Sequence, residues 1–174
     1  MTFKRNLLYG LGTALILLFF SSFASYFSIK TLIDNSQMVR KSNQIIKDLD
    51  NVFSLVKDAE TGQRGYLLTG DQVFLEPYTK SKDKISGALD QLSSEISNTA
   101  TQSKNLEKLK SSVNDRLEIL EKNLNDKKNK NAVTTQQLLA GKSYMDNIRS
   151  TVSTMQNEEK LILQSRTESM DKLA

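Results

Sequence analysis

Residues 106–124, LEKLKSSVNDRLEILEKNL, set the fold class of this 174-residue chain. Their apolar residues recur every three or four positions, as on one face of an α-helix, and charged or amide side chains occupy most other positions. The apolar stripe consists of Leu106, Leu109, Val113, Leu117, Leu120 and Leu124. We therefore expect an amphipathic helix that packs this stripe against other helices.

Three further segments have the same helical spacing. A coiled-coil-like seam between about residues 37 and 59 has Val39, Ile46 and Phe53 seven residues apart, with Leu49 and Val56 three residues after two of them. The other stripes are Ile85, Leu89, Leu92 and Ile96, and then Met145, Ile148, Val152, Met155 and Ile162. We predict helices at about 31–69, 77–97, 102–130 and 133–172. Such helices bury their stripes most simply as an all-α, antiparallel up-down-up-down four-helix bundle.

The turn between the first two helices has a clear signature. Gly70 is expected to end one helix in the left-handed conformation, and Asp71 to accept a hydrogen bond at the start of the next. Pro77 fits the first turn of the second main helix, with residues 71–76 as a short preceding turn. The second helix is expected to end near Ser97 and Asn98, and residues 126–131 to form a solvated turn.

The N-terminal segment predicts a membrane anchor. Residues 6–29 carry no charge and follow Lys4 and Arg5. As a helix they would span about 36 Å, more than the hydrocarbon core of about 30 Å. We expect a transmembrane helix at 7–29, a cytoplasmic N-terminus at 1–6 and an extracytoplasmic domain at 30–174, because positive residues stay inside. With no breaker after Ile29, the membrane helix should continue directly into the first bundle helix.

A cleavable signal peptide is the competing interpretation of this segment. Small residues at Ser22 and Ala24 would suit a cut after Ala24. Signal peptides, however, usually have an apolar region of about 7–15 residues, and here the apolar run continues through Phe27 and Ile29. An uncleaved, single-pass anchor in an inner or plasma membrane is therefore the preferred prediction.

Composition excludes several classes of function. The chain has no Cys and no His, which excludes disulfides, thiolate or imidazole metal sites, histidine-dependent catalysis and a phospho-accepting histidine. Beyond Lys4 and Arg5 the chain has 22 basic and 20 acidic residues, so its net charge there is close to zero. Nucleic-acid binding is therefore not expected. No cofactor or metal is expected, and no nucleophile arrangement or phosphate loop indicates an enzyme.

Two motifs are more specific than helical periodicity requires. Residues 58–71 read DAETGQRGYLLTGD, and residues 74–78 read FLEPY. Further along come Gly141, Lys142, Met145, Asp146, Ile148 and Arg149, then Glu158, Glu159 and Arg166. Together they closely resemble the type 3 CHASE domain, an extracellular sensory module of bacterial histidine kinases, cyclases and chemoreceptors, over roughly residues 35–170.

The resemblance implies a four-helix sensory domain between two membrane helices, the second feeding a cytoplasmic kinase, cyclase or chemoreceptor output. This chain contains neither that second span nor the output, so we expect both in a longer receptor or a partner. The leading hypothesis is the input domain of a sensor histidine kinase or related receptor, which forms a homodimer through its first and last helices. The alternative is a single-pass helical adaptor that binds a partner and senses no small ligand.

The motif residues have two interpretations. Glu60, Gln63, Arg64 and Tyr66 are candidates for binding a polar ligand; alternatively, Glu60 and Arg64 are an ordinary i, i+4 helix pair. Structural roles are expected for Thr61, Gly62, Gly65, Gly70, Asp71, Pro77 and Glu159. Gly62 and Gly65 each cost a helix about 1 kcal/mol relative to alanine, which suggests close approach of another helix. If that is the fourth helix, Glu158 or Glu159 could meet Arg64.

Overall fold

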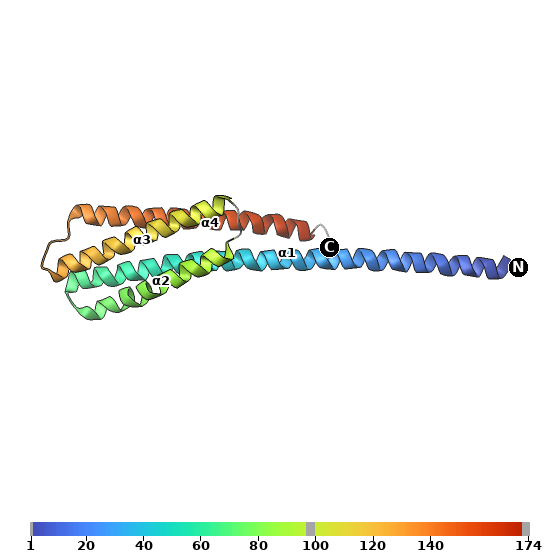
Figure 1. The fold of residues 1–174 in the computed structure, drawn as a ribbon, viewed down its shortest axis with the longest axis horizontal. Coiled ribbons are helices and arrows are strands. Elements are labelled where there is room, and N and C mark those ends of the chain that lie inside the picture. The colour runs from blue at the N-terminus through green and yellow to red at the C-terminus, as the bar shows by residue number, and fades with distance from the viewer. Residues whose placement is uncertain (1, 97–99, 172–174) are drawn as a thin grey trace. The chain divides into compact units, whose positions relative to one another are not determined.

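The computed structural model of the chain describes residues 2–96 and 100–171. Its elements are α1 (Thr2–Thr69), the short 3-10 helix η1 (Gln72–Leu75), α2 (Glu76–Glu95), α3 (Ala100–Lys128) and α4 (Thr135–Asp171) (Figure 1). No β-strand occurs within the described ranges, which confirms the all-helical class. The up-down-up-down order stays a prediction, and the predicted helix end at Ser97 and Asn98 lies outside the described residues.

The chain divides into two compact units, which we describe separately. Met1–Arg40 and Leu163–Ala174 form the first, here called the apolar unit, and Lys41–Ile162 form the second, the bundle unit. The helix α1 contributes residues to both, and it is unbroken from Thr2 to Thr69 as the absence of Pro and of a breaker after Ile29 predicted.

All four long helices contribute to one hydrophobic core in the bundle unit. Its buried members include Ile45, Leu49, Val52 and Val56; Ile85, Leu89, Leu92 and Ile96; Leu106, Leu109 and Val113; and Met145, Ile148, Val152 and Met155. These residues follow the predicted stripes of the last three helices, except that Leu117 is only partly buried and Ile162 is exposed. Removing this apolar surface from water supplies most of the stability of such a bundle.

The predicted seam of the first helix was partly wrong. Leu49 and Val56 are fully buried, but Ile46 and Phe53 are only partly buried, and Ile45 and Val52 occupy the core beside them. Adjacent apolar pairs give α1 an apolar face wider than one seam, so a spacing of seven fits either member of each pair. The packing of the helices decides which member of each pair is buried. The partly buried ring of Phe53 instead contacts Arg149, whose guanidinium carbon lies 5.8 Å from the ring centroid.

The turn from α1 into α2 has the geometry that its sequence predicts. Gly70 has a φ of 75°, and its N–H donates to the Tyr66 carbonyl at 2.8 Å. The side chain of Asp71 accepts from the Val73 N–H at 3.0 Å and so caps η1. Pro77 lies in the first turn of α2, where its missing N–H costs no hydrogen bond. The turn thereby fixes where η1 and the start of α2 meet α1.

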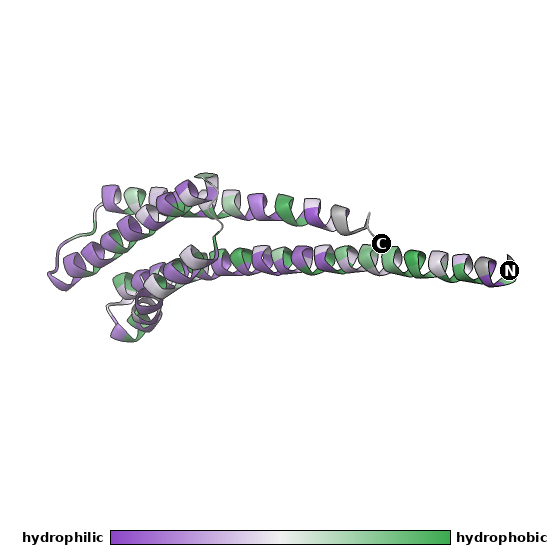
Figure 2. Cartoon of the chain, turned by 45° about the vertical axis from the view of Figure 1, so that its right-hand side comes forward, coloured by the Kyte–Doolittle hydropathy of each residue, from purple (hydrophilic) through white to green (hydrophobic). Residues whose placement is uncertain are grey.

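The apolar unit presents an unusually apolar helix surface. Figure 2 shows apolar residues concentrated in the N-terminal part of α1, where the side chains of residues 15–20 are all exposed. The hydroxyls of Thr13 and Thr31 donate to the carbonyls of Gly10 and Phe27, so the helix satisfies them internally. Within the described residues, α1 alone is long and apolar enough to cross a membrane, judged by length and composition.

Candidate functional site

The two glycines of the motif allow η1 and the first turn of α2 to press against α1. A Cβ on Gly62 would lie 2.7 Å from the Tyr78 backbone nitrogen and 3.0 Å from the Phe74 carbonyl oxygen. A Cβ on Gly65 would lie 2.9 Å from the Phe74 ring. The expected close approach is therefore present, but the approaching segment is the η1–α2 junction rather than the fourth helix.

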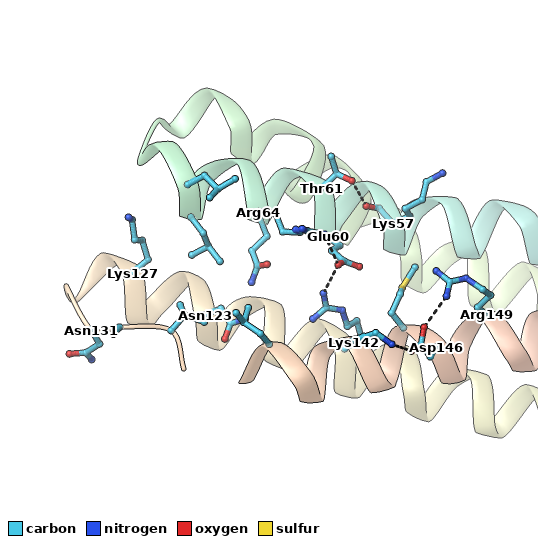
Figure 3. A pocket seen from close by; sticks show the side chains of 18 residues that line it. Lys57, Glu60, Thr61, Arg64, Asn123, Lys127, Asn131, Lys142, Asp146 and Arg149 are labelled. Atoms are coloured by element: carbon cyan, nitrogen blue, oxygen red, sulfur yellow. Dashed lines mark hydrogen bonds and ion pairs between the residues drawn. The ribbon is translucent and has the colours of Figure 1, made fainter. Parts of the chain in front are cut away.

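A large cleft lies inside the bundle unit. It has a volume of about 1030 Å³ and opens between α1, α3, the segment after α3, and α4 (Figure 3). Its charged lining residues are Lys57, Glu60, Arg64, Arg116, Lys127, Lys142, Asp146 and Arg149. Six of these eight are cationic, so the cleft is strongly basic although the whole bundle is nearly neutral.

Arg116 of α3 is a buried charged residue that lines the cleft. Its side chain is 5% exposed, and its Nη2 lies 3.4 Å from Glu60 Oε1. The same Glu60 oxygen is 3.7 Å from Arg64 Nη1, so one carboxylate serves two guanidinium groups. Burial lowers the pKa of the Arg116 guanidinium, and Glu60 opposes that shift. The buried Nε of Arg116 has no hydrogen-bond partner.

The fourth helix makes room for this guanidinium at Gly141. A Cβ there would lie too close to Nη1 of Arg116 and 3.1 Å from its Cζ, so the guanidinium would have to shift. A glycine inside a helix is unfavourable by about 1 kcal/mol relative to alanine. Gly141, which the second motif singled out, is therefore explained by the space that Arg116 occupies.

Asn123 and Asp146 are two further polar groups of the lining. Asn123 of α3 is buried, and its Oδ1 has no hydrogen-bond partner. On α4, Asp146 is shared by Lys142 Nζ at 2.5 Å and Arg149 Nη1 at 2.9 Å, as the dashed lines of Figure 3 show. The hydrogen bond from Lys142 lowers the pKa of the Asp146 carboxyl. Both carboxylates of the cleft are thus already engaged, each by two cations.

The structure separates the four residues proposed to bind a ligand. Glu60, Gln63 and Arg64 line the cleft, but the amide of Gln63 donates to the Leu120 carbonyl at 3.0 Å and ties α1 to α3. Tyr66 is buried in a second hydrophobic cluster with Ala59, Tyr78, Leu120 and Leu124, and is not part of the lining. The hydroxyl of Thr61 donates to the Lys57 carbonyl at 2.8 Å, within α1.

The fourth helix does not approach the glycines, and the pairing of Arg64 with Glu159 that depended on this approach does not form. Glu159 is buried and accepts a hydrogen bond from Gln102 Nε2 at 3.0 Å. Arg64 meets Glu60 instead, on its own helix. The partner that reaches Glu60 across the bundle is Arg116, which the sequence motifs did not include.

The arrangement favours binding rather than catalysis. Its functional groups are guanidinium, ammonium and amide donors with two paired carboxylates, and such groups hold oxyanions through charge-assisted hydrogen bonds. Within residues 2–96 and 100–171, no group of three or more Asp or Glu side chains could hold a metal ion.

Three comparisons place the chain among known proteins, and the family comparison confirms the predicted resemblance. The sensor domain of the Rhodopseudomonas palustris histidine kinase HK9, known from a crystal structure, has a TM-score of 0.46 and 19% sequence identity, covering 75% of this chain and 96% of that one. The comparison with curated proteins gave no significant match. The CHASE3 domain family matches residues 35–169, most of the chain. This chain therefore belongs to the CHASE3 domain family.

Proposed function

We propose that this chain is the extracytoplasmic sensory input domain of a transmembrane receptor, held to the bilayer by residues 7–29. The observation that carries the proposal is the CHASE3 match over residues 35–169, since CHASE3 is a sensory domain rather than a catalytic one. The match begins only a few residues after the apolar segment of α1, as expected for a sensory domain that emerges from a membrane.

The exposed apolar surface of α1 supports the membrane part of the proposal. Residues 15–20 and the neighbouring aromatic residues Phe23 and Phe27 are at least half exposed. A continuous surface of this kind is unfavourable in water, whereas a lipid bilayer covers it without cost to the backbone, whose hydrogen bonds lie within the helix. Lys4 and Arg5 favour a cytoplasmic N-terminus, which places residues 30–174 on the other side.

Signal transfer is proposed to use α1 itself. The helix runs without a break from Thr2 to Thr69 and lines the cleft with Glu60 and Arg64. Displacements of about 1–2 Å are typical of helices that transmit a signal. A homodimer through the first and last helices is part of the proposal, and Leu32, Ile33 and Met38 offer exposed apolar contacts on α1. The output module is proposed to be a histidine kinase, cyclase or chemoreceptor segment on a longer polypeptide or a partner.

Single-cysteine labelling tests the topology. Because the chain has no Cys, each variant carries a single reactive thiol. In bacteria that express the chain, we expect a membrane-impermeant maleimide to label Asn129→Cys on intact spheroplasts, and Lys4→Cys only after lysis. Both variants should stay with the membrane after a carbonate wash.

Two results of this experiment would contradict the proposal. Labelling of Lys4→Cys on intact spheroplasts would reverse the orientation. A shortened, soluble product of the Asn129→Cys variant that still reacts with the maleimide would show that the segment is a cleaved signal peptide, and a domain without an anchor could not act as proposed.

A further inference from the structure

The cationic groups of the cleft outnumber the carboxylates that could neutralise them. Glu60 is shared by Arg64 and Arg116, and Asp146 by Lys142 and Arg149. At the solvent-exposed rim, water screens the excess charge, but Arg116 is buried. A buried charge that is not fully compensated is strongly unfavourable. Arg116 shares its carboxylate partner, Glu60, with Arg64, so the cleft favours an additional anion.

The Nε of Arg116 also lacks a hydrogen-bond acceptor. A guanidinium donates up to five N–H bonds, and the ion pair that it makes with Glu60 is a loose one, at 3.4 Å. The Nε therefore has an unused donor inside the protein, and an oxyanion supplies both an acceptor and further negative charge.

A second unpaired atom lies on the same helix. Asn123 is seven residues after Arg116, which is two turns and about 10 Å along α3, and its buried Oδ1 also has no partner. Both residues line the cleft. A molecule that satisfies both therefore has an anionic end and a hydroxyl or N–H end. A chain of about eight bonds matches the spacing of the two residues along α3.

The space around these groups suits a carbon skeleton. Leu67, Leu68, Val133, Leu138 and Met145 also line the cleft, and Leu68 and Leu138 are largely exposed. Exposed apolar side chains around a few convergent polar groups are typical of sites for small organic molecules.

We infer that the cleft binds an elongated small organic anion, with its carboxylate or phosphate on Arg116 and a donor group at its other end on Asn123. Arg64 and Lys142 add attraction at the rim. The claim that this ligand is the stimulus of a receptor rests on the proposed sensory function. The claim that it binds in the cleft does not.

Titration calorimetry on the full chain in lipid nanodiscs, with empty nanodiscs subtracted, tests this inference. The probes are 8-hydroxyoctanoate and 8-hydroxyoctyl phosphate, with inorganic phosphate as the headgroup alone. The neutral 1,8-octanediol and the cationic 8-amino-1-octanol have matched skeletons. We expect the two organic anions to bind and the neutral and cationic probes not to bind. Whichever anion binds more tightly identifies the headgroup class.

Variants locate the site. Arg116→Gln should weaken binding of the better anion at least about tenfold, because a charge-assisted hydrogen bond is lost. Arg64→Gln, at a side chain that is 71% exposed, should weaken it by a smaller factor. Lys127→Gln and Lys122→Gln form a matched pair on α3, since both remove one exposed positive charge but only Lys127 lines the cleft. Only Lys127→Gln should weaken binding.

Three results would overturn the inference: no binding of either organic anion, equally tight binding of the diol, or unchanged affinity in both Arg116→Gln and Arg64→Gln. If Arg116→Gln does not fold, as judged by its helical circular dichroism, Arg64→Gln and the Lys127 and Lys122 pair decide the result. If the calorimetry contradicts the binding site, the cysteine-labelling result does not change. The two experiments therefore test the binding site and the proposed membrane topology separately.

Discussion

Replacing Ile45 with alanine is expected to lower the free energy of unfolding by about 3 kcal/mol, whereas the same change at the neighbouring Ile46 should lower it by about 1 kcal/mol. Ile45 is 1% exposed and belongs to the central core, and Ile46 is only partly buried. Truncation at Ile45 removes apolar contacts and leaves a cavity, while water can fill the space left at Ile46.

Chemical denaturation followed by circular dichroism measures both changes. The two variants share residue type, helix and neighbourhood, so differences in helix propensity cancel. A larger loss for Ile46→Ala would mean that the seven-residue seam through Val39, Ile46 and Phe53 is the true core face of α1. Equal losses would contradict the difference in burial between the two residues.

The second large effect is expected at Gly62, where alanine should lower the free energy of unfolding by about 2 kcal/mol. Alanine gains about 1 kcal/mol of helix propensity, but its Cβ would lie 2.7 Å from the backbone nitrogen of Tyr78. That atom belongs to the first turn of α2 and cannot move alone, so η1 and α2 must shift away from α1, and overpacking of this kind costs roughly 1–3 kcal/mol or more.

Gly87→Ala is the matched control. Gly87 lies inside α2, and no atom is within 4 Å of the Cβ it would carry. This variant should therefore gain about 1 kcal/mol from helix propensity alone. A stabilising effect of Gly62→Ala similar to that of Gly87→Ala would show that η1 and α2 do not contact α1 as closely as the structure places them.

Periodicity predicted the bundle well where one apolar stripe stands alone. The stripe of α2, from Ile85 to Ile96, is buried, and the capping signals at Gly70 and Asp71 matched the turn. Where apolar residues are adjacent, as at Ile45 and Ile46, spacing alone could not choose the buried member. The exposed Ile162 shows a further limit, because a stripe does not tell how far along a helix the core extends.

The site was predicted in part. The DAETGQRGYLLTGD motif contains Glu60 and Arg64, which line the cleft that we propose as a binding site. The apolar stripe of α3 does not single out Arg116, because it leaves this residue among the polar positions around the stripe. A stricter heptad register through Leu109, Val113 and Leu120 puts Arg116 and Asn123 at core positions. A charge at a core position is a signal for a binding or pairing site, and that signal was present in the sequence.

The contact between α3 and α1 could not have been predicted from spacing. Glu60 and Arg64 are a favourable pair on one helix, and nothing in the sequence shows that a third charge from α3 approaches the same carboxylate. Likewise, Glu159 was expected near Arg64 but is held by Gln102, because the order in which helices meet is set by tertiary packing rather than by any single stripe.

The most direct test of the central claim, that this bundle is a sensory input domain that acts through its cleft, is the output of a chimeric receptor. Residues 1–171 are joined to a second membrane helix and a histidine kinase domain, and autophosphorylation is measured in membranes. We predict that Arg64→Gln and Arg116→Gln change the kinase activity relative to the unsubstituted chimera, while Lys122→Gln does not. An active kinase with the same output in all four membrane-inserted, folded proteins would contradict the account.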